Sequence, residues 1–179
     1  MPHAPTTTRT GRYSDLVGAG RDALARTRPK DVDTIAIDEG VERFLELFET
    51  FDSDSVAAAA RALYANNAYF NDVFVELWGA NAVADYLAQS ADKTADIEID
   101  VEDCVQAEGE VYLRWTMRFE TNGLRSRTVT APGITHLRFD DGGRIAYHRD
   151  YWDGSGALAE FVPLVGGVLR SVRSSLHSR

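Results

Sequence analysis

The fold is decided by the stretch His148-Arg149-Asp150-Tyr151-Trp152-Asp153 near the C-terminus. It follows the turn-forming sequence Asp140-Asp141-Gly142-Gly143, so glycine-rich turn chemistry leads into aromatic and β-branched residues. This order is typical of the second strand of a β-hairpin. Because successive side chains of a strand point to opposite faces, His148, Asp150 and Trp152 share one face. The pattern therefore predicts a carboxylate flanked by an imidazole and an indole.

That carboxylate has two interpretations. If Asp150 lies in a half-buried apolar setting, its pKa is raised, as a general acid or base requires. Alternatively, Asp150 and His148 lie at a strand end, paired with an arginine or exposed to water. The two interpretations differ in one observable, which is whether Asp150 faces an apolar cavity or bulk solvent.

Composition narrows the class of protein. The chain has 179 residues, 44% hydrophobic and 26% charged, which is typical of one globular domain. Net charge is −9, although residues 1–30 hold an excess of four positive charges, so the rest is strongly acidic. An acidic body repels phosphates, which argues against a nucleic-acid partner. The single cysteine, Cys104, fits a reducing compartment, and no apolar run is long enough to span a membrane. We expect a cytoplasmic protein without membrane association.

Periodicity divides the chain into a tail and one domain. Residues 1–33 contain Pro2, Pro5 and Pro29 and little periodicity, which predicts a disordered or loosely helical basic tail before a domain over 34–179. Apolar residues from Ile37 to Phe51 recur at helical spacing. Further helices are expected from Ser55 to about Ala65 and from Gly79 to about Gln89, with a short strand at 68–72 between them.

The remainder favours long strands. Residues 96–105, 110–120 and 125–139 alternate between apolar and polar side chains, with a bulge or bend expected at Ala131-Pro132-Gly133. Apolar residues from Leu158 to Val172 then form a basic amphipathic segment. Helices followed by antiparallel strands indicate an α+β domain.

The order of these elements resembles the nuclear transport factor 2-like superfamily, which includes ketosteroid isomerases, limonene-epoxide hydrolases and SnoaL-type polyketide cyclases. The resemblance covers about residues 37–165. It is carried by Leu63-Tyr64-Ala65-Asn66-Asn67, Gly79, Gly143-Arg144-Ile145 and the string 149–153. It implies a strongly curved antiparallel β-sheet cone wrapped around the N-terminal helices, followed by the C-terminal amphipathic segment. It also implies an apolar ligand pocket and a homodimer.

Residue by residue, the resemblance implies a site that is only partly that of the isomerases. Their general-base Asp matches Asp72. Their oxyanion-hole Tyr falls on Phe44, which has no hydroxyl, and their second oxyanion donor falls on Thr135. Since each such donor contributes roughly 2.7–4 kcal/mol, we do not expect a ketosteroid isomerase.

The match to the epoxide hydrolases is also partial. Their last-strand Asp matches Asp150, but the resemblance places the rest of their catalytic set on Leu113, Trp115, Phe70 and Asp72. A register slipped by one residue reverses the faces of each strand. It would instead supply Tyr69, Asn71 and Arg114. We prefer the register that keeps Trp115 and Met117 inward, in which only Asp150 of that set is retained.

The remaining candidates are Asp72 and Asp150, with His148 as the modulator of Asp150. Two carboxylates in one low-dielectric pocket split their pKa values, giving one acid and one base. The alternative is structural: Asp72 caps a turn and Asp150 binds His148. The substrate-binding surface that the resemblance implies consists of Phe44, Phe70, Tyr86, Trp115, Met117, Phe119, Thr135 and Trp152.

These observations predict a cofactor-independent enzyme of SnoaL-like cyclase, isomerase or hydrolase type acting on a hydrophobic small molecule. Asp150 is the principal acid–base residue and Asp72 the second carboxylate. No metal site is expected, because His136 lies on the face opposite Thr135 and two ligands do not make a zinc site. The alternative function, from another class, is a non-catalytic ligand-binding or dimerisation module of the same fold.

Overall fold

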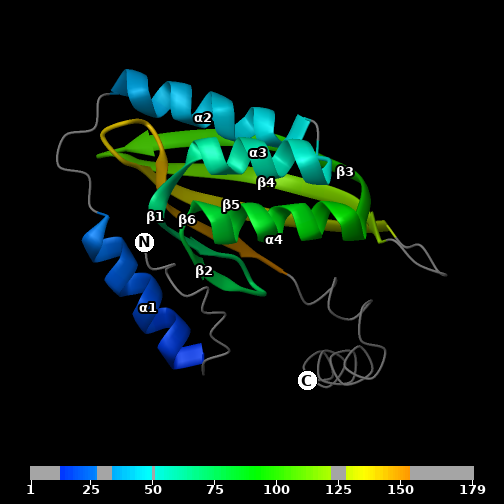
Figure 1. The fold of residues 1–179 in the computed structure, drawn as a ribbon, viewed down its shortest axis with the longest axis horizontal. Coiled ribbons are helices and arrows are strands. Elements are labelled where there is room, and N and C mark those ends of the chain that lie inside the picture. Colours follow the sequence, from blue (N-terminus) through cyan, green and yellow to red (C-terminus); the bar gives the residue numbers. More distant parts are fainter. Residues whose placement is uncertain (1–12, 28–33, 50, 122–127, 154–179) are drawn as a thin grey trace, which may run out of the picture.

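The computed structural model describes residues 13–27, 34–49, 51–121 and 128–153 (Figure 1). The predicted C-terminal amphipathic segment lies outside them. The described residues form helices and one open six-stranded sheet, which confirms the α+β class. The elements, in chain order, are α1 (Tyr13–Arg26), α2 (Thr34–Glu49), α3 (Ser53–Leu63), β1 (Tyr64–Asn71), β2 (Glu76–Trp78), α4 (Ala80–Lys93), β3 (Thr94–Ala107), β4 (Glu110–Thr121), β5 (Thr128–Phe139) and β6 (Ile145–Trp152).

The strand order of the sheet is β2-β1-β6-β5-β4-β3. Neighbouring strands are antiparallel except β1 and β6, which pair in parallel with Phe70 opposite His148. The sheet is therefore mixed, and the expectation of a purely antiparallel sheet needs this correction. The direction of β6 is fixed by its hairpin with β5, whereas β1 reaches the sheet from α3. No turn couples the directions of β1 and β6, so alternation along each strand could not predict their pairing.

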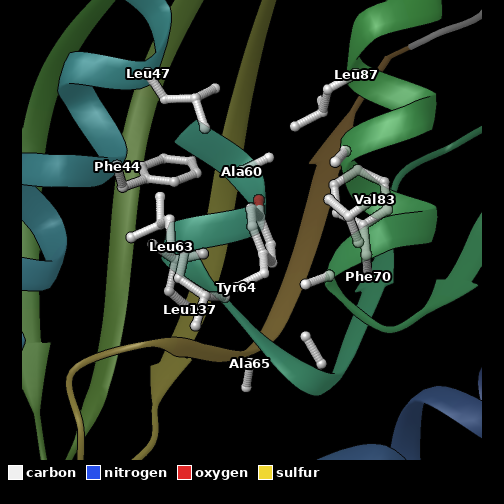
Figure 2. Packing of buried hydrophobic residues seen from close by; sticks show 14 of the residues in the cluster. Phe44, Leu47, Ala60, Leu63, Tyr64, Ala65, Phe70, Val83, Leu87 and Leu137 are labelled. Carbon is white, nitrogen blue, oxygen red and sulfur yellow. The ribbon is translucent and has the colours of Figure 1, made fainter. Parts of the chain in front are cut away.

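Three helices cover one face of the sheet, as Figure 1 shows for α2, α3 and α4. In α2, Ile37, Val41, Phe44 and Leu47 are buried at helical spacing. These side chains meet those of α3 and α4 over the sheet, and Figure 2 shows Phe44 and Leu47 facing this core. Helix packing and the curved sheet thus enclose one apolar interior.

Local sequence signals fix the ends of these helices. The Asp52 side chain accepts hydrogen bonds from the backbone N–H groups of Asp54 (3.2 Å) and Ser55 (3.0 Å), which caps the N-terminus of α3. Gly79 precedes α4 with φ of 88°, a left-handed conformation that favours glycine. The predicted helix starts near 55 and 79 are therefore confirmed within two residues.

Two tight turns set the register of the long strands. Glu108 and Gly109 both have positive φ and join β3 to β4 as a two-residue hairpin loop. Between β5 and β6, the Asp140 carboxylate accepts hydrogen bonds from the N–H groups of Gly142 (2.9 Å) and Arg144 (3.0 Å). The hairpin predicted before β6 is confirmed, and its register places Thr135 opposite Asp150.

The bulge expected at Ala131-Pro132-Gly133 is absent from the β4–β5 ladder, where the register runs without a shift. Gly133 serves packing instead. A Cβ atom at this position would lie 2.3 Å from Cη2 of Trp115, so the indole occupies the space over the glycine. Register shifts occur in β3, between Ala95 and Glu98 and between Val101 and Asp103.

Within the region 1–33, which was predicted to be disordered or loosely helical, residues 13–26 form helix α1. Ala23 of α1 is fully buried against Tyr69 of β1 and Tyr147 of β6. Gly20 permits this approach, because a Cβ there would lie 2.7 Å from Arg149 Nη1 and 3.2 Å from the Tyr69 hydroxyl. The sequence did not point to this contact, because the described contacts of the helix are made by small residues such as Gly20 and Ala23, which contribute little hydrophobic periodicity.

Candidate active site

The candidate site lies on the face of β5 and β6 that the helices cover. Alternation puts Thr135 of β5 and His148 and Asp150 of β6 on this inner face. The predicted sharing of one face by His148, Asp150 and Trp152 agrees with the structure, since all three line one cavity. The side chain of Asp150 is 18% exposed, and no described ion pair joins it to an arginine. Its carboxylate thus faces the apolar interior.

Hydrogen bonds converge on one oxygen of Asp150. Oδ1 accepts a hydrogen bond from the Thr135 hydroxyl (2.6 Å) and lies 2.9 Å from His148 Nε2. The indole N–H of Trp115 donates to Thr135 Oγ1 (2.8 Å). Because an indole N–H can only donate, the Thr135 hydroxyl is left to donate to Asp150. Among the described residues, none donates a hydrogen bond to Oδ2.

The tautomer of His148 follows from its second partner. Its Nδ1 lies 2.6 Å from the hydroxyl of Tyr64, the first residue of β1. Burial raises the pKa of Tyr64 well above its ordinary value, so this hydroxyl stays protonated. We assign it as the donor of the hydrogen bond to Nδ1. Nε2 then carries the imidazole proton and donates to Asp150. The imidazole of His148 thus links the Tyr64 hydroxyl to Asp150 Oδ1 through its two ring nitrogens.

A cavity of about 390 Å³ lies beside this carboxylate. It is bounded by α2, α4, the inner faces of β3–β6 and the turn after β1. Its volume falls in the range of small-molecule sites. The structure brings all eleven residues of the predicted site into the lining of this one cavity, and their roles remain predictions. They are Asp150, Asp72, His148, Phe44, Phe70, Tyr86, Trp115, Met117, Phe119, Thr135 and Trp152.

Asp72 has more bonds than Asp150. It follows β1, and its Oδ1 accepts the backbone N–H groups of Phe74 (2.7 Å) and Val75 (2.8 Å). Its Oδ2 accepts a hydrogen bond from the Tyr86 hydroxyl at 2.5 Å. Burial raises the pKa of Asp72 against these hydrogen bonds, and the nearby charge of Asp150 adds to the rise. Asp72 therefore both caps a turn and lines the cavity, so the two interpretations are combined in one residue.

The inward register preferred from the resemblance is confirmed. Leu113, Trp115 and Met117 line the cavity. Arg114 points to the outer face, where its guanidinium pairs with Glu102 at 2.8 Å. Tyr69 also lies on the outer face, under α1. The slipped register, which would have supplied the hydrolases' Arg and Tyr, is excluded.

Sequence reasoning missed several residues of the site, one of them behind the cavity wall. The most informative is Tyr64, whose hydroxyl sets the tautomer of His148 across 84 positions of the chain. It stands within a stretch quoted for the resemblance, yet no spacing rule predicts its contact. Other apolar lining residues had a usable signal, because they lie on faces predicted to be inward: Phe48, Phe51, Ile97, Ile99 and Val101.

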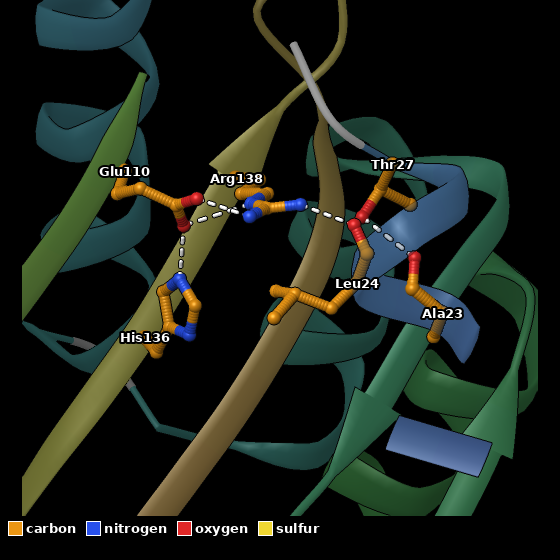
Figure 3. Close-up of polar contacts among 6 residues, drawn as sticks. All are labelled: Ala23, Leu24, Thr27, Glu110, His136 and Arg138. Carbon is orange, nitrogen blue, oxygen red and sulfur yellow. Dashed lines mark hydrogen bonds and ion pairs between the residues drawn. The ribbon is translucent and has the colours of Figure 1, made fainter. Parts of the chain in front are cut away.

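A second histidine–carboxylate pair occupies the outer face of the same sheet. His136 Nε2 contacts Glu110 Oε2, and Arg138 binds the same carboxylate through two nitrogens (Figure 3). Arg138 also donates to the backbone carbonyl of Leu24 in α1, which closes the cluster. Among the described residues, no group of three or more His, Cys, Asp or Glu could hold a metal ion. Nor does any described helix combine the length and apolarity needed to cross a bilayer.

Comparison with known proteins supports the same architecture. A family model of the SnoaL-like domain matches residues 41–148. No curated protein matches the sequence. Among solved structures, a candidate SnoaL-like polyketide cyclase from Jannaschia sp. CCS1 is 16% identical, with a TM-score of 0.60 over 73% of this chain and 95% of that chain.

Two further solved structures have the same fold. A protein of ketosteroid isomerase-like fold from Catenulispora acidiphila, in complex with trimethylamine, is 17% identical, with a TM-score of 0.58 over 68% of this chain and 90% of that chain. An LEH-like epoxide hydrolase from M. tuberculosis is 22% identical, with a TM-score of 0.54 over 72% of this chain and 96% of that chain. At these identities the likeness concerns the fold alone.

Proposed function

The chain belongs to the SnoaL-like domain family, and on that premise we propose that it is a cofactor-independent enzyme. It performs acid–base chemistry on a hydrophobic small molecule in the cavity, of the cyclase or isomerase kind. One observation carries the proposal. Asp150 faces the cavity with Oδ1 held by Thr135 and His148, while Oδ2 receives no hydrogen bond from the described residues.

In this reaction Asp150 is the proton-transfer group. Oδ2 accepts a proton from a carbon acid of the substrate and can return it to another atom of the same molecule. The Thr135 hydroxyl and the His148 Nε2–H hold the carboxylate in one orientation, and Tyr64 holds His148 in turn. The apolar wall excludes water, which strengthens these electrostatic interactions.

Asp72 is the second carboxylate of the proposal, in a supporting role. Both of its oxygens already accept hydrogen bonds, from two backbone N–H groups and from the Tyr86 hydroxyl. It therefore has less capacity than Asp150 to take a proton from substrate without releasing a partner. We assign it the positioning of Tyr86 at the cavity wall.

A second candidate function is a non-catalytic ligand-binding module. The observation that favours it is the lack of an oxyanion hole among the described residues: Phe44 offers no hydroxyl, and Thr135 directs its proton to Asp150. A binding module needs only the apolar cavity. Assembly as a homodimer and a cytoplasmic location, expected from the resemblance and the composition, stay predictions in either case.

The test is turnover of a substrate panel of epoxides, 3-ketosteroids and polyketide β-ketones. Asp150→Asn is expected to lower the rate of any compound that is turned over by about 10²–10⁴-fold. Asp100→Asn is the matched control, because Asp100 is an exposed carboxylate on the outer side of β3. If a compound is turned over equally by Asp150→Asn and the wild type, Asp150 is not the acid–base residue. Tight binding without any turnover would favour the module.

A further inference from the structure

Most polar hydrogens of the described cavity wall are already used within the protein. The Tyr86 hydroxyl donates to Asp72 and the Ser90 hydroxyl to the backbone carbonyl of Tyr86. The Thr94 hydroxyl donates to the carbonyl of Ser90. The donors Trp115 N–H, Thr135 O–H and His148 Nε2–H form the chain of hydrogen bonds that ends at Asp150, and none of the described residues accepts a hydrogen bond from the indole N–H of Trp152.

What the described wall offers to a ligand is therefore mainly acceptor oxygen and aromatic faces, with one indole N–H, that of Trp152, as a donor. Asp150 Oδ2 receives no hydrogen bond from the described residues, and Asp72 Oδ2 receives only that of Tyr86. Among the described residues the lining contains no arginine, and Lys93, the lysine in it, is exposed. In this part of the wall an anionic ligand would thus meet two carboxylates, with the indole N–H of Trp152 as the available donor inside the cavity.

The aromatic side chains of the cavity also favour a cation over an anion. Phe44, Phe70, Tyr86, Trp115 and Trp152 line the cavity around the two carboxylates. The face of an aromatic ring carries negative electrostatic potential, so a cation held against it is attracted, and more strongly where water is excluded. Carboxylates and ring faces together favour positive charge in this space.

We infer that the substrate of this cavity is a hydrophobic amine, bound as its cation with the charged nitrogen between Asp150 and the aromatic wall. This inference rests on the proposed function, because it names the substrate class of the same site. It departs from that proposal in one respect: it concerns the charge of the bound molecule and not the chemistry performed on it.

Three probes of nearly equal size isolate the charge. They are phenyltrimethylammonium, its uncharged isostere tert-butylbenzene, and the tetrahedral anion benzenesulfonate. Dissociation constants for the wild-type protein are measured by calorimetry or by quenching of tryptophan fluorescence, since Trp115 and Trp152 line the cavity. We expect the cation to bind at least tenfold more tightly than the neutral probe, and the anion most weakly. This comparison needs no variant, so it does not depend on a mutant that folds.

Variants then locate the effect. Asp150→Asn is expected to abolish the advantage of the cation over tert-butylbenzene while changing the affinity for tert-butylbenzene less than twofold. Asp100→Asn removes the same formal charge from the outer surface and is expected to keep the preference. Thermal unfolding of each variant confirms that it is folded.

Three outcomes would overturn the inference: equal or tighter binding of tert-butylbenzene, no detectable binding of the cation, or an unchanged preference in Asp150→Asn. None of them affects the turnover comparison described for the proposed function. Conversely, a cavity that prefers the cation but turns nothing over would retain the ligand class and remove the enzymatic role. The two proposals can therefore fail separately.

Discussion

The two faces of the sheet each carry a histidine–carboxylate pair, and the pairs differ in their surroundings. On the inner face, His148 and Asp150 meet Thr135, Tyr64 and an open cavity. On the outer face, the carboxylate of Glu110 meets both His136 and the guanidinium of Arg138.

The difference shows what separates a candidate site from a structural pair. Both carboxylates are largely buried, at 18% exposure for Asp150 and 21% for Glu110. Glu110 has a cationic partner for both oxygens, and α1 covers that partner. Asp150 lines the cavity, and its Oδ2 accepts no hydrogen bond from the described residues. The residue types are nearly the same, so an unused acceptor and a cavity, not the pair itself, suggest chemistry.

The largest effect on stability is expected from Arg138→Met. The guanidinium of Arg138 lies between the Glu110 carboxylate and α1, so removing it leaves this carboxylate without its cation. Breaking a buried ion pair in this way lowers the free energy of unfolding by about 3–5 kcal/mol. The measurement is the free energy of unfolding from urea titration at pH 7.

The matched control for that change is Arg114→Met. Arg114 also pairs with a glutamate of the neighbouring strand, but its side chain is 58% exposed. A loss of no more than about 1 kcal/mol is expected there. Equal losses in the two variants would show that the outer cluster is an ordinary surface ion pair.

A smaller effect concerns acid pH. Burial opposes the charge of Glu110, but hydrogen bonds from Arg138 and His136 outweigh it and lower the pKa below the ordinary 4.5. The unfolded chain therefore takes up the proton first as the pH falls, and the stability that the ionised Glu110 contributes is lost below about pH 4.5. Burial likewise lowers the pKa of His136, so protonation of the unfolded chain costs stability below about pH 6.5.

The substitution Glu110→Gln tests whether the pKa of Glu110 is lowered in the folded protein. At pH 7 the variant is expected to be less stable than the wild type by about 1.5–3 kcal/mol, the range for hydrogen bonds to charged groups. The gap should narrow as the pH falls below 4.5, because the wild type loses the same charge. The measurement is unfolding free energy at several pH values. A gap independent of pH would contradict the assignment of a lowered pKa.

The smallest effect is expected for Tyr64→Phe on the inner face. The ring keeps its packing, and the loss of one hydrogen bond costs about 0.5–1.5 kcal/mol of stability. If Tyr64 positions the tautomer of His148, the pH profile of turnover or ligand binding should shift as well. Tyr86→Phe, which loses its bond to Asp72 and not to His148, is the comparison. If Tyr64→Phe changes the stability but leaves the pH profile of turnover or binding unchanged, Tyr64 has a structural role only and does not position His148.

Sequence reasoning recovered the parts of the fold that depend on local order. Alternation along β6 and β4 placed His148, Asp150, Trp115 and Met117 inward, and the Asp-Gly turn fixed the hairpin that precedes β6. It did not predict the packing of α1 on the sheet, the parallel pairing of β1 with β6 or the bond from Tyr64 to His148. These features depend on surfaces that meet after the chain has folded.

By itself, then, the amino-acid sequence determined which side chains share a face, because the period of a strand or helix acts over neighbouring residues. Only the tertiary structure decided what each face meets. It left a cavity beside Asp150, placed against Glu110 a guanidinium that also binds α1, and gave Asp72 two backbone donors. The physical reason is that burial and hydrogen-bond partners are set by segments far apart in the chain, and these set the chemistry of each carboxylate.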